Sequence, residues 1–206
     1  MTDSRKTFKR ESSDQRQDAL IEATLLLIAQ GGPEAATVRN IAKQAGVTLG
    51  LIRHYFNSKE DLIGAAYERH MTTMRYASYE GDLSGVAGLT ALITVALSPP
   101  VTDVCALALW AGFIQSVQRD SAMRAIHEKT YFEFRDQLQV LISEAYIALG
   151  QSKDVVELRR LAIACNAVLD GLWLEGSALP NSFEVGELPA IGLASVGAIL
   201  GMELKQ

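Results

Sequence analysis

The chain has 206 residues, of which 49% are hydrophobic and 21% are charged, and this balance excludes a globally disordered protein. Its two cysteines exclude a disulfide-stabilised scaffold, and they lack the spacing of a zinc or redox motif. The formal net charge of −5, taken as a single number, argues against a nucleic-acid-binding protein, which usually carries a surplus of basic residues.

The charge is not spread evenly along the chain. Residues 1–60 hold nine Lys and Arg against seven Asp and Glu, net +2, whereas residues 61–206 hold ten against seventeen, net −7. This asymmetry favours a polyanion as the partner of the N-terminal part, and statistical scatter explains it equally well. A basic N-terminal arm suits either a DNA minor groove or a solvated tail, and it consists of Arg5, Lys6, Lys9 and Arg10.

Neither a signal peptide nor a membrane span is expected. Residues 1–18 are polar and lack the apolar centre of a signal peptide. The longest uncharged apolar run, residues 104–114, is far shorter than the roughly 20 residues that cross a bilayer. With few cysteines and no such segment, the expected compartment is the cytoplasm.

Helical spacing of apolar residues recurs along the chain, whereas the alternation typical of strands is absent. Together with capping and stop residues, this spacing predicts an all-α fold of about nine helices. The expected helices are 14–30, 38–45, 49–56, 59–78, a segment that ends at Pro99, 101–119, 121–149, 154–177 and 187–203.

Two short predicted helices flank the turn formed by residues 46–48. A helix-turn-helix needs a small residue where the helices touch, a turn residue that tolerates a positive φ, and apolar residues that fix the angle. Ala42 and Gly46 meet the first two needs. The apolar residues are Ile41, Ala45, Val47, Ile52 and Tyr55. The pattern predicts a helix-turn-helix whose second helix presents its N-terminal half to a major groove.

Several residues at the helix starts are candidates for DNA contact. Thr37 and Arg39 suit phosphate, since a hydroxyl, a guanidinium and free backbone N–H groups meet there, and Thr37 also suits a plain N-cap. Thr48 is expected to cap the second helix and to touch phosphate. Leu49 suits a thymine methyl group, and Gly50 allows the backbone to approach DNA closely.

Four further candidates have two interpretations each. Arg53 suits a guanine or a phosphate. His54 suits phosphate or packing, and Tyr55 suits the core or a phosphate. Lys59 suits a phosphate or solvent.

The residues around this turn resemble a known family. Residues 36–48, ATVRNIAKQAGVT, resemble the second helix and turn of the TetR family of bacterial transcriptional repressors, and residues 50–62, GLIRHYFNSKEDL, resemble its recognition helix and the start of its fourth helix. The spelling GLIRHYF, with LDGLWL at residues 169–174, resembles the BetI-like branch. The family commonly has Tyr where this chain has Arg53, so its base contacts do not transfer to that position.

The resemblance implies a homodimer with two domains in each subunit. Residues 1–60 would comprise the N-terminal arm and a three-helix DNA-binding head, and residues 61–206 a helical body for ligand binding and dimerisation. The resemblance also implies a repressor that binds a palindromic operator and is released by a small-molecule inducer.

The second half of the chain carries polar groups inside apolar helical patterns. Asn166 and Asp170 lie four residues apart on one face of the helix 154–177, and Trp173 follows three residues later. A carboxylate beside an indole suits a cationic ligand, and the choline associated with BetI-like proteins points the same way. A structural hydrogen-bonding role for Asp170 is the alternative. The aromatic residues that suit the lining of such a cavity, or plain core, are Trp110, Phe113, Tyr131 and Phe134.

The helix 154–177 is apolar on nearly all sides, so one face is expected to meet the chain's own core and the other a second subunit. The last helix repeats small residues, which allow close helix approach between subunits or within one chain. The residues assigned to a homodimer interface are Leu161, Cys165, Val168, Leu172, Gly192 and Gly197.

No enzyme motif accompanies these features. The three histidines, His54, His70 and His127, form no zinc motif, no phosphate loop or nucleophile elbow occurs, and neither a metal nor another cofactor is expected. The favoured function is a ligand-responsive regulator that binds double-stranded DNA. The alternatives are a helical enzyme and a helical adaptor without DNA binding, and the adaptor leaves the pattern of residues 37–59 unexplained.

Overall fold

The computed structural model describes residues 13–77 and 83–205, which contain nine α-helices, one short 3-10 helix and no strand. The predicted all-α class is confirmed. The basic arm near residues 5–10 lies outside the described residues. None of the helices in the described ranges combines the length and the apolar character that crossing a membrane requires.

The chain divides into two compact units at a point inside one helix. The N-terminal unit ends at Ala66 and the C-terminal unit begins at Tyr67, both within α4 (Lys59–Ala77). This division lies six residues beyond the boundary expected from the sequence. Because α4 is one continuous helix, its first two turns belong to the N-terminal unit and the rest to the C-terminal unit.

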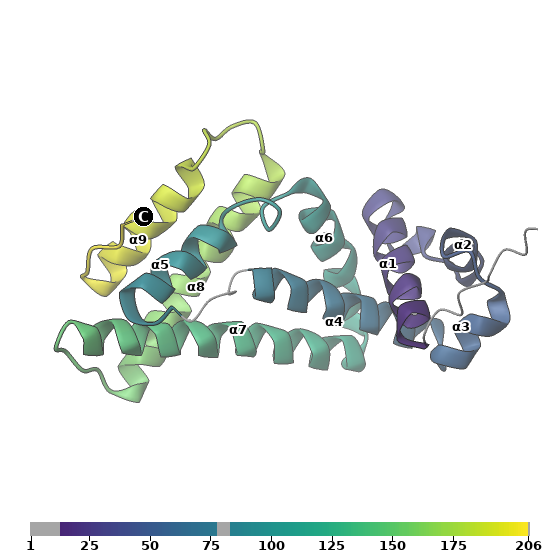
Figure 1. Ribbon diagram of the computed structural model, residues 1–206, viewed down its shortest axis with the longest axis horizontal. Helices are drawn as coiled ribbons and strands as arrows, with labels where there is room; N and C mark the ends of the chain where they lie inside the picture. The colour runs from purple at the N-terminus through teal and green to yellow at the C-terminus, as the bar shows by residue number, and fades with distance from the viewer. Residues whose placement is uncertain (1–12, 78–82, 206) are drawn as a thin grey trace, which may run out of the picture. The chain divides into compact units, whose positions relative to one another are not determined.

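The N-terminal unit is a small helical cluster built from α1, η1, α2, α3 and the start of α4 (Figure 1). The elements before α4 are α1 (Ser13–Gly31), η1 (Pro33–Ala35), α2 (Val38–Gln44) and α3 (Leu49–Tyr55). Each helix contributes an apolar side chain that is nearly or fully buried, and the largest of these are Leu20, Ile28, Ile41, Ile52 and Leu62.

Local chemistry sets the helix ends in this unit. The Thr37 hydroxyl accepts a hydrogen bond of 3.2 Å from the Asn40 amide, as the predicted N-cap of α2, and the Ser58 hydroxyl caps α4 by accepting one of 3.0 Å from the Asp61 amide. Gly46 ends α2 with φ of 67°, a conformation that favours glycine. Thr48 stands at the N-cap position of α3, but its side chain makes no capping bond, contrary to expectation.

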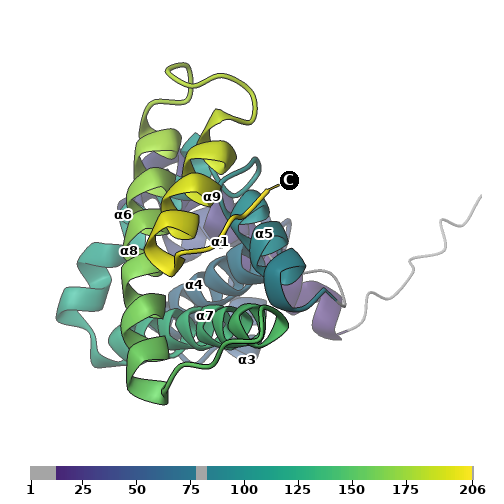
Figure 2. The same cartoon turned by 90° about the vertical axis from the view of Figure 1, so that its left-hand side faces the viewer.

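Five further helices follow in the C-terminal unit: α5 (Gly85–Ala96), α6 (Val104–Arg119), α7 (Ser121–Ala148), α8 (Val155–Ala178) and α9 (Glu187–Leu200). The 28-residue α7 runs beneath α5, α8 crosses α7, and α9 packs beside α8 and α5 (Figures 1 and 2). A continuous apolar core between these helices includes the fully buried Leu89, Leu92, Ile93, Leu138 and Ile142.

Aspartate caps fix the starts of α6, α7 and α8. The carboxylate of Asp103 accepts from the Ala106 amide at 2.8 Å, and Asp120 and Asp154 cap α7 and α8 in the same way. The expectation that a helix begins at residue 101 was wrong by three residues, because Asp103 holds the start of α6 at Val104. Residues 101–103 therefore form a turn whose backbone carbonyls are available to other partners.

Candidate DNA-binding and effector sites

The helix-turn-helix of α2 and α3 has a buried side and an exposed side. Ile41 and Ile52 are 0% and 3% exposed, and Ala42 is 5% exposed at the contact between the helices. The candidates for DNA contact lie on the opposite side. Seven of the nine are exposed, namely Thr37, Arg39, Thr48, Leu49, Gly50, Arg53 and His54.

The other two candidates, Tyr55 and Lys59, are half-buried. The Tyr55 ring meets the His54 ring edge-on, with 5.0 Å between centroids, so packing accounts for part of its position. Lys59 is the first residue of α4, near the two short helices in sequence.

Leu49 and Gly50 at the start of α3 are unusual residues for an exposed helix. Leu49 is 50% exposed, and nothing in the N-terminal unit covers it. A Cβ added to Gly50 would meet only the Thr48 hydroxyl, at 4.0 Å, and Gly50 does not have a positive φ. The fold therefore has no need of glycine at this position, although glycine is a poor helix former. A macromolecule that approaches the backbone closely requires a residue without a side chain at this position.

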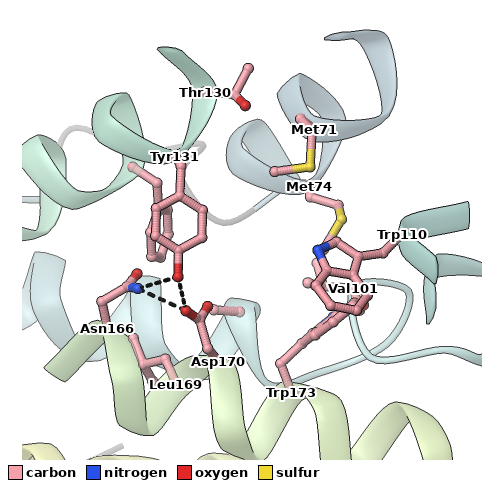
Figure 3. A pocket seen from close by; sticks show the side chains of 12 residues that line it. Met71, Met74, Val101, Trp110, Thr130, Tyr131, Asn166, Leu169, Asp170 and Trp173 are labelled. Carbon is pink, nitrogen blue, oxygen red and sulfur yellow. Dashed lines mark hydrogen bonds between the residues drawn. The ribbon is translucent and has the colours of Figure 1, made fainter. Parts of the chain in front are cut away.

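The C-terminal unit contains a cavity of about 110 Å³ between α4, α6, α7 and α8 (Figure 3). It is lined mainly by apolar and aromatic side chains, with a few polar groups at one end, an arrangement typical of small-molecule sites. The lining residues are Met71, Met74, Ala96, Val101, Trp110, Thr130, Tyr131, Phe134, Asn166, Leu169, Asp170 and Trp173.

Three polar side chains form a hydrogen-bonded cluster at one end of the cavity. The Tyr131 hydroxyl donates to Asp170 Oδ2, and the Asn166 amide donates to the same oxygen at 2.8 Å and to the Tyr131 hydroxyl at 2.9 Å (Figure 3). Burial raises the pKa of Asp170, and the bonds from Tyr131 and Asn166 oppose this rise because they favour the charged form. Burial also raises the pKa of Tyr131 to about 12, so its phenol stays protonated.

Two tryptophans form another wall of the cavity. The Trp110 and Trp173 rings meet edge to face with centroids 6.0 Å apart. The Trp173 indole donates to the Val101 carbonyl at 2.8 Å, within the turn that precedes α6. This bond fixes the orientation of the Trp173 ring, which comes from the same helix as Asp170.

The structure brings six of the seven proposed ligand residues to this cavity, and Phe113 is the exception. Phe113 is 1% exposed and packs against Tyr67 and His70, with ring centroids 4.7 and 6.4 Å away. It belongs to the core beside the cavity rather than to the lining. Sequence reasoning missed Met71 and Met74, which bring α4 to the cavity, although their spacing of three residues places them on one helical face.

Three of the six residues assigned to a subunit interface, Cys165, Gly192 and Gly197, are buried within the single chain. Cys165 is 0% exposed, and burial raises the pKa of its thiol to about 11. A Cβ on Gly192 would come within 2.3 Å of Leu97, and one on Gly197 within 2.7 Å of the Met202 carbonyl oxygen. Close packing within one chain accounts for the burial of these three positions, and their assignment to a seam between subunits stays a prediction. The half-buried members are Leu161, Val168 and Leu172.

Comparison with known proteins assigns both units to one family. The model for bacterial regulatory proteins of the tetR family matches residues 20–66, and the model for the C-terminal part of BetI-type transcriptional repressors matches residues 86–201, more than half of the chain. The chain belongs to the TetR family, in its BetI-type branch. It is a DNA-binding transcriptional regulator rather than an enzyme, as its family and relatives are.

Individual relatives agree with this assignment. The chain is 28% identical over 182 residues to the transcriptional regulator BetI 2 of Chromohalobacter salexigens, covering 84% of this chain and 82% of that protein. A transcriptional regulator from Pseudomonas aeruginosa superimposes with a TM-score of 0.80 at 30% identity, covering 95% of both chains. A regulator from Saccharomonospora viridis, solved in complex with choline, has the same fold, with a TM-score of 0.71 at 18% identity over 87% of this chain and 94% of that one.

Proposed function

We propose that the chain is a homodimeric repressor in the cytoplasm that binds a palindromic operator through α2 and α3 and is released by a small cationic effector. The observation that carries the effector part is the Asp170 carboxylate held beside aromatic rings in one cavity. A carboxylate supplies charge complementary to a cation, and the faces of Trp and Tyr rings attract cations as well.

The size of the cavity limits the effector to a small molecule. An apolar cavity of roughly 150 Å³ accepts benzene, and this one measures about 110 Å³. A compact amine or ammonium compound of several heavy atoms fits that space, whereas a long acyl chain does not. The choline bound by the Saccharomonospora viridis regulator belongs to this size and charge class.

The DNA-binding part of the proposal rests on the exposed side of the helix-turn-helix. Arg39 and Arg53 offer guanidinium groups to phosphate or to base edges. Leu49 offers an apolar contact, and Gly50 leaves room for the DNA backbone or a base edge to come close. The total charge of −5 does not oppose this, because the acidic excess belongs to residues 61–206.

An exposed face on α8 and α9 supports a homodimer. These two helices lie side by side (Figure 2), and each shows small or apolar side chains to solvent at helical spacing. Small residues allow helices of two subunits to approach closely in a four-helix seam. The exposed residues of this face are Ala164, Ala167, Gly171, Leu174, Ala190, Ile191, Ala194 and Ala198.

A binding experiment tests these steps in order. Operator DNA is selected from random duplexes by the purified protein, and its affinity is measured at several salt concentrations with and without choline. We expect a sequence-preferring complex that weakens steeply as salt rises, because phosphate contacts release counterions. We also expect choline to weaken the complex, and sedimentation to give a dimer. A monomer that shows no sequence preference at about 100 mM salt would contradict the proposal and favour a helical adaptor.

A further inference from the structure

The carboxylate at the polar end of the cavity has one oxygen in use and one available. Asp170 Oδ2 accepts hydrogen bonds from the Tyr131 hydroxyl and, at 2.8 Å, from the Asn166 amide. Asp170 Oδ1 receives no hydrogen bond from the residues that the structure describes. An ionised carboxylate offers about four lone-pair sites. A ligand can therefore bind to the free oxygen without breaking the cluster.

Asn166 carries a second acceptor that is not in use. Its side chain lines the cavity and is only 4% exposed. Its Nδ2 donates to Asp170 and Tyr131, but its Oδ1 is buried and has no hydrogen-bond partner within residues 13–77 and 83–205. Buried acceptors usually have a partner, because leaving one without a donor costs free energy. A ligand that brings N–H groups to this end of the cavity supplies the missing donor.

The aromatic ring beside the carboxylate has neighbours already. The His127 ring lies 5.4 Å from the Tyr131 ring, centroid to centroid, and the Arg135 guanidinium lies 5.9 Å from the Tyr131 centroid. His127 and Arg135 stand one helical turn before and one after Tyr131 on α7, so they flank its ring from both sides. Tyr131 therefore offers its hydroxyl, rather than a free face, to the polar end of the cavity.

The other aromatic side chains of the lining do not surround the carboxylate either. The edge of one tryptophan covers part of the face of the other, because Trp110 and Trp173 meet at an interplanar angle of 71°. Trp173 and Phe134 also pack against the apolar core. Proteins that bind quaternary ammonium ions typically enclose them in a cage of several ring faces. The lining residues that the structure describes form no such cage around Asp170.

We propose that the cavity selects a cation that carries N–H bonds, a protonated primary or secondary amine, over a quaternary ammonium ion. This inference rests on the proposed function, in which a small cation binds beside Asp170. One N–H of the ligand donates to Asp170 Oδ1, and a second donates to Asn166 Oδ1. Charge-assisted hydrogen bonds bring the nitrogen and the oxygen to about 2.7–2.9 Å, whereas methyl groups hold a quaternary nitrogen farther away.

The size of the cavity also favours the smaller head group. Its volume of about 110 Å³ is below the roughly 150 Å³ that accepts benzene, so each added methyl group is harder to enclose. Hydration opposes the preference, because an ammonium with N–H bonds is more strongly hydrated and costs more to transfer from water. Asn166 Oδ1 offsets part of that cost, since it is buried and has no donor from the described residues before the ligand binds.

Ethanolamine and choline are matched probes for this preference. Both carry one positive charge near neutral pH and one hydroxyl, and they differ only in the methyl groups on nitrogen. The N-methyl and N,N-dimethyl compounds complete the series, and calorimetry measures the affinity of the wild type for each. We expect ethanolamine to bind at least about tenfold more tightly than choline. With two acceptors, the primary and secondary amines should bind alike, and affinity should fall at the tertiary amine and again at choline.

Two variants assign the preference to its cause. Asn166→Leu removes one acceptor, so the fall at the tertiary amine should disappear while the fall at choline remains. Trp110→Leu is the control: it removes an aromatic face and should leave the ratio of ethanolamine to choline affinity unchanged within about twofold. Thermal unfolding checks that both variants fold. The methylation series is measured on the wild type and needs neither variant.

The alternative results separate the inference from the proposed function. If choline binds as tightly as ethanolamine, or more tightly, the preference for N–H bonds is overturned while the proposed function stands. If Trp110→Leu abolishes the preference and Asn166→Leu keeps both steps, ring faces rather than acceptors select the ligand, and the inference is again overturned. If none of the four compounds binds, the proposed effector is contradicted and the inference falls with it.

Discussion

The two units hold their functional side chains in different ways. In the N-terminal unit the candidates for DNA contact, such as Arg53 and Gly50, are mostly exposed, and the fold does not depend on them. In the C-terminal unit the polar groups of the cavity bond to one another, as Asn166 and Asp170 do. A substitution in the N-terminal unit should break no contact within the fold, and one in the cavity should change several contacts at once. Four predictions test this difference.

The largest effect is expected at the cavity carboxylate. Asp170→Asn keeps the shape of the side chain but removes its charge, and choline affinity should fall about 100-fold, or about 2.7 kcal/mol. The fold should be retained, because burial already disfavours the charged form of Asp170 and raises its pKa. Asp136→Asn, on the exposed face of α7, is the matched control and should bind choline normally. Unchanged choline binding in Asp170→Asn would leave Asp170 with a structural role only.

The next effect separates two kinds of DNA contact. If Arg53 reads a base, Arg53→Ala should cost about 1–3 kcal/mol and relax the preference at one base pair. Lys59→Ala should weaken binding to all sequences about equally. It should also reduce the slope of log affinity against log salt concentration by about one. Both comparisons need only the selected duplex and a set of single-base variants of it. Uniform weakening by Arg53→Ala would assign Arg53 to the phosphate backbone.

A third effect concerns a buried histidine in the C-terminal unit. Burial lowers the pKa of His70 from 6.5 to about 4. Between these values the unfolded chain binds a proton that the folded chain excludes, so stability falls as the pH falls through this window and is constant above it. The loss should reach about 2 kcal/mol between pH 7.5 and pH 5.

Denaturant unfolding of the wild type and of His70→Leu at both pH values measures this loss of stability. The variant should lose about 2 kcal/mol less than the wild type on acidification. Equal losses would show that His70 takes up its proton in the folded state.

The smallest effect tests the difference between the two units most directly. Gly50→Ala should stabilise α3 by about 0.5–1 kcal/mol, because alanine is the better helix former and the added Cβ meets no close neighbour. The same change should weaken DNA binding about tenfold if the DNA approaches this backbone. Thermal unfolding and DNA titration of one protein sample measure both. A stabilised variant with unchanged DNA affinity would remove Gly50 from the interface.

The sequence predicted local features well because their causes are local. The helices, the caps at Thr37 and Ser58, and the positive φ of Gly46 all follow from residues within a few positions of one another. The predicted start of α6 at residue 101 was wrong because the Asp103 side chain caps the helix, which therefore begins at Val104.

Features that depend on distant segments were harder to predict. The helix α8 carries two apolar stripes, and the sequence does not say which one meets the core. The stripe with Cys165 lies inside the chain, while that with Ala167 and Leu174 is exposed. The choice between cavity lining and plain core at Phe113 stayed open for the same reason, since only the packing of α4 and α6 decides which side of an apolar helix faces a cavity.

The walls of the cavity also differ in their chemistry. In the proposed function, charge recognition comes from α7 and α8, where Tyr131, Asn166 and Asp170 hold one another in place. The opposite wall includes two adaptable methionines of α4, Met71 and Met74. Substitution of the methionines, in evolution or in the design of a biosensor, could therefore fit the cavity to cations of other shapes while Asp170 stays unchanged.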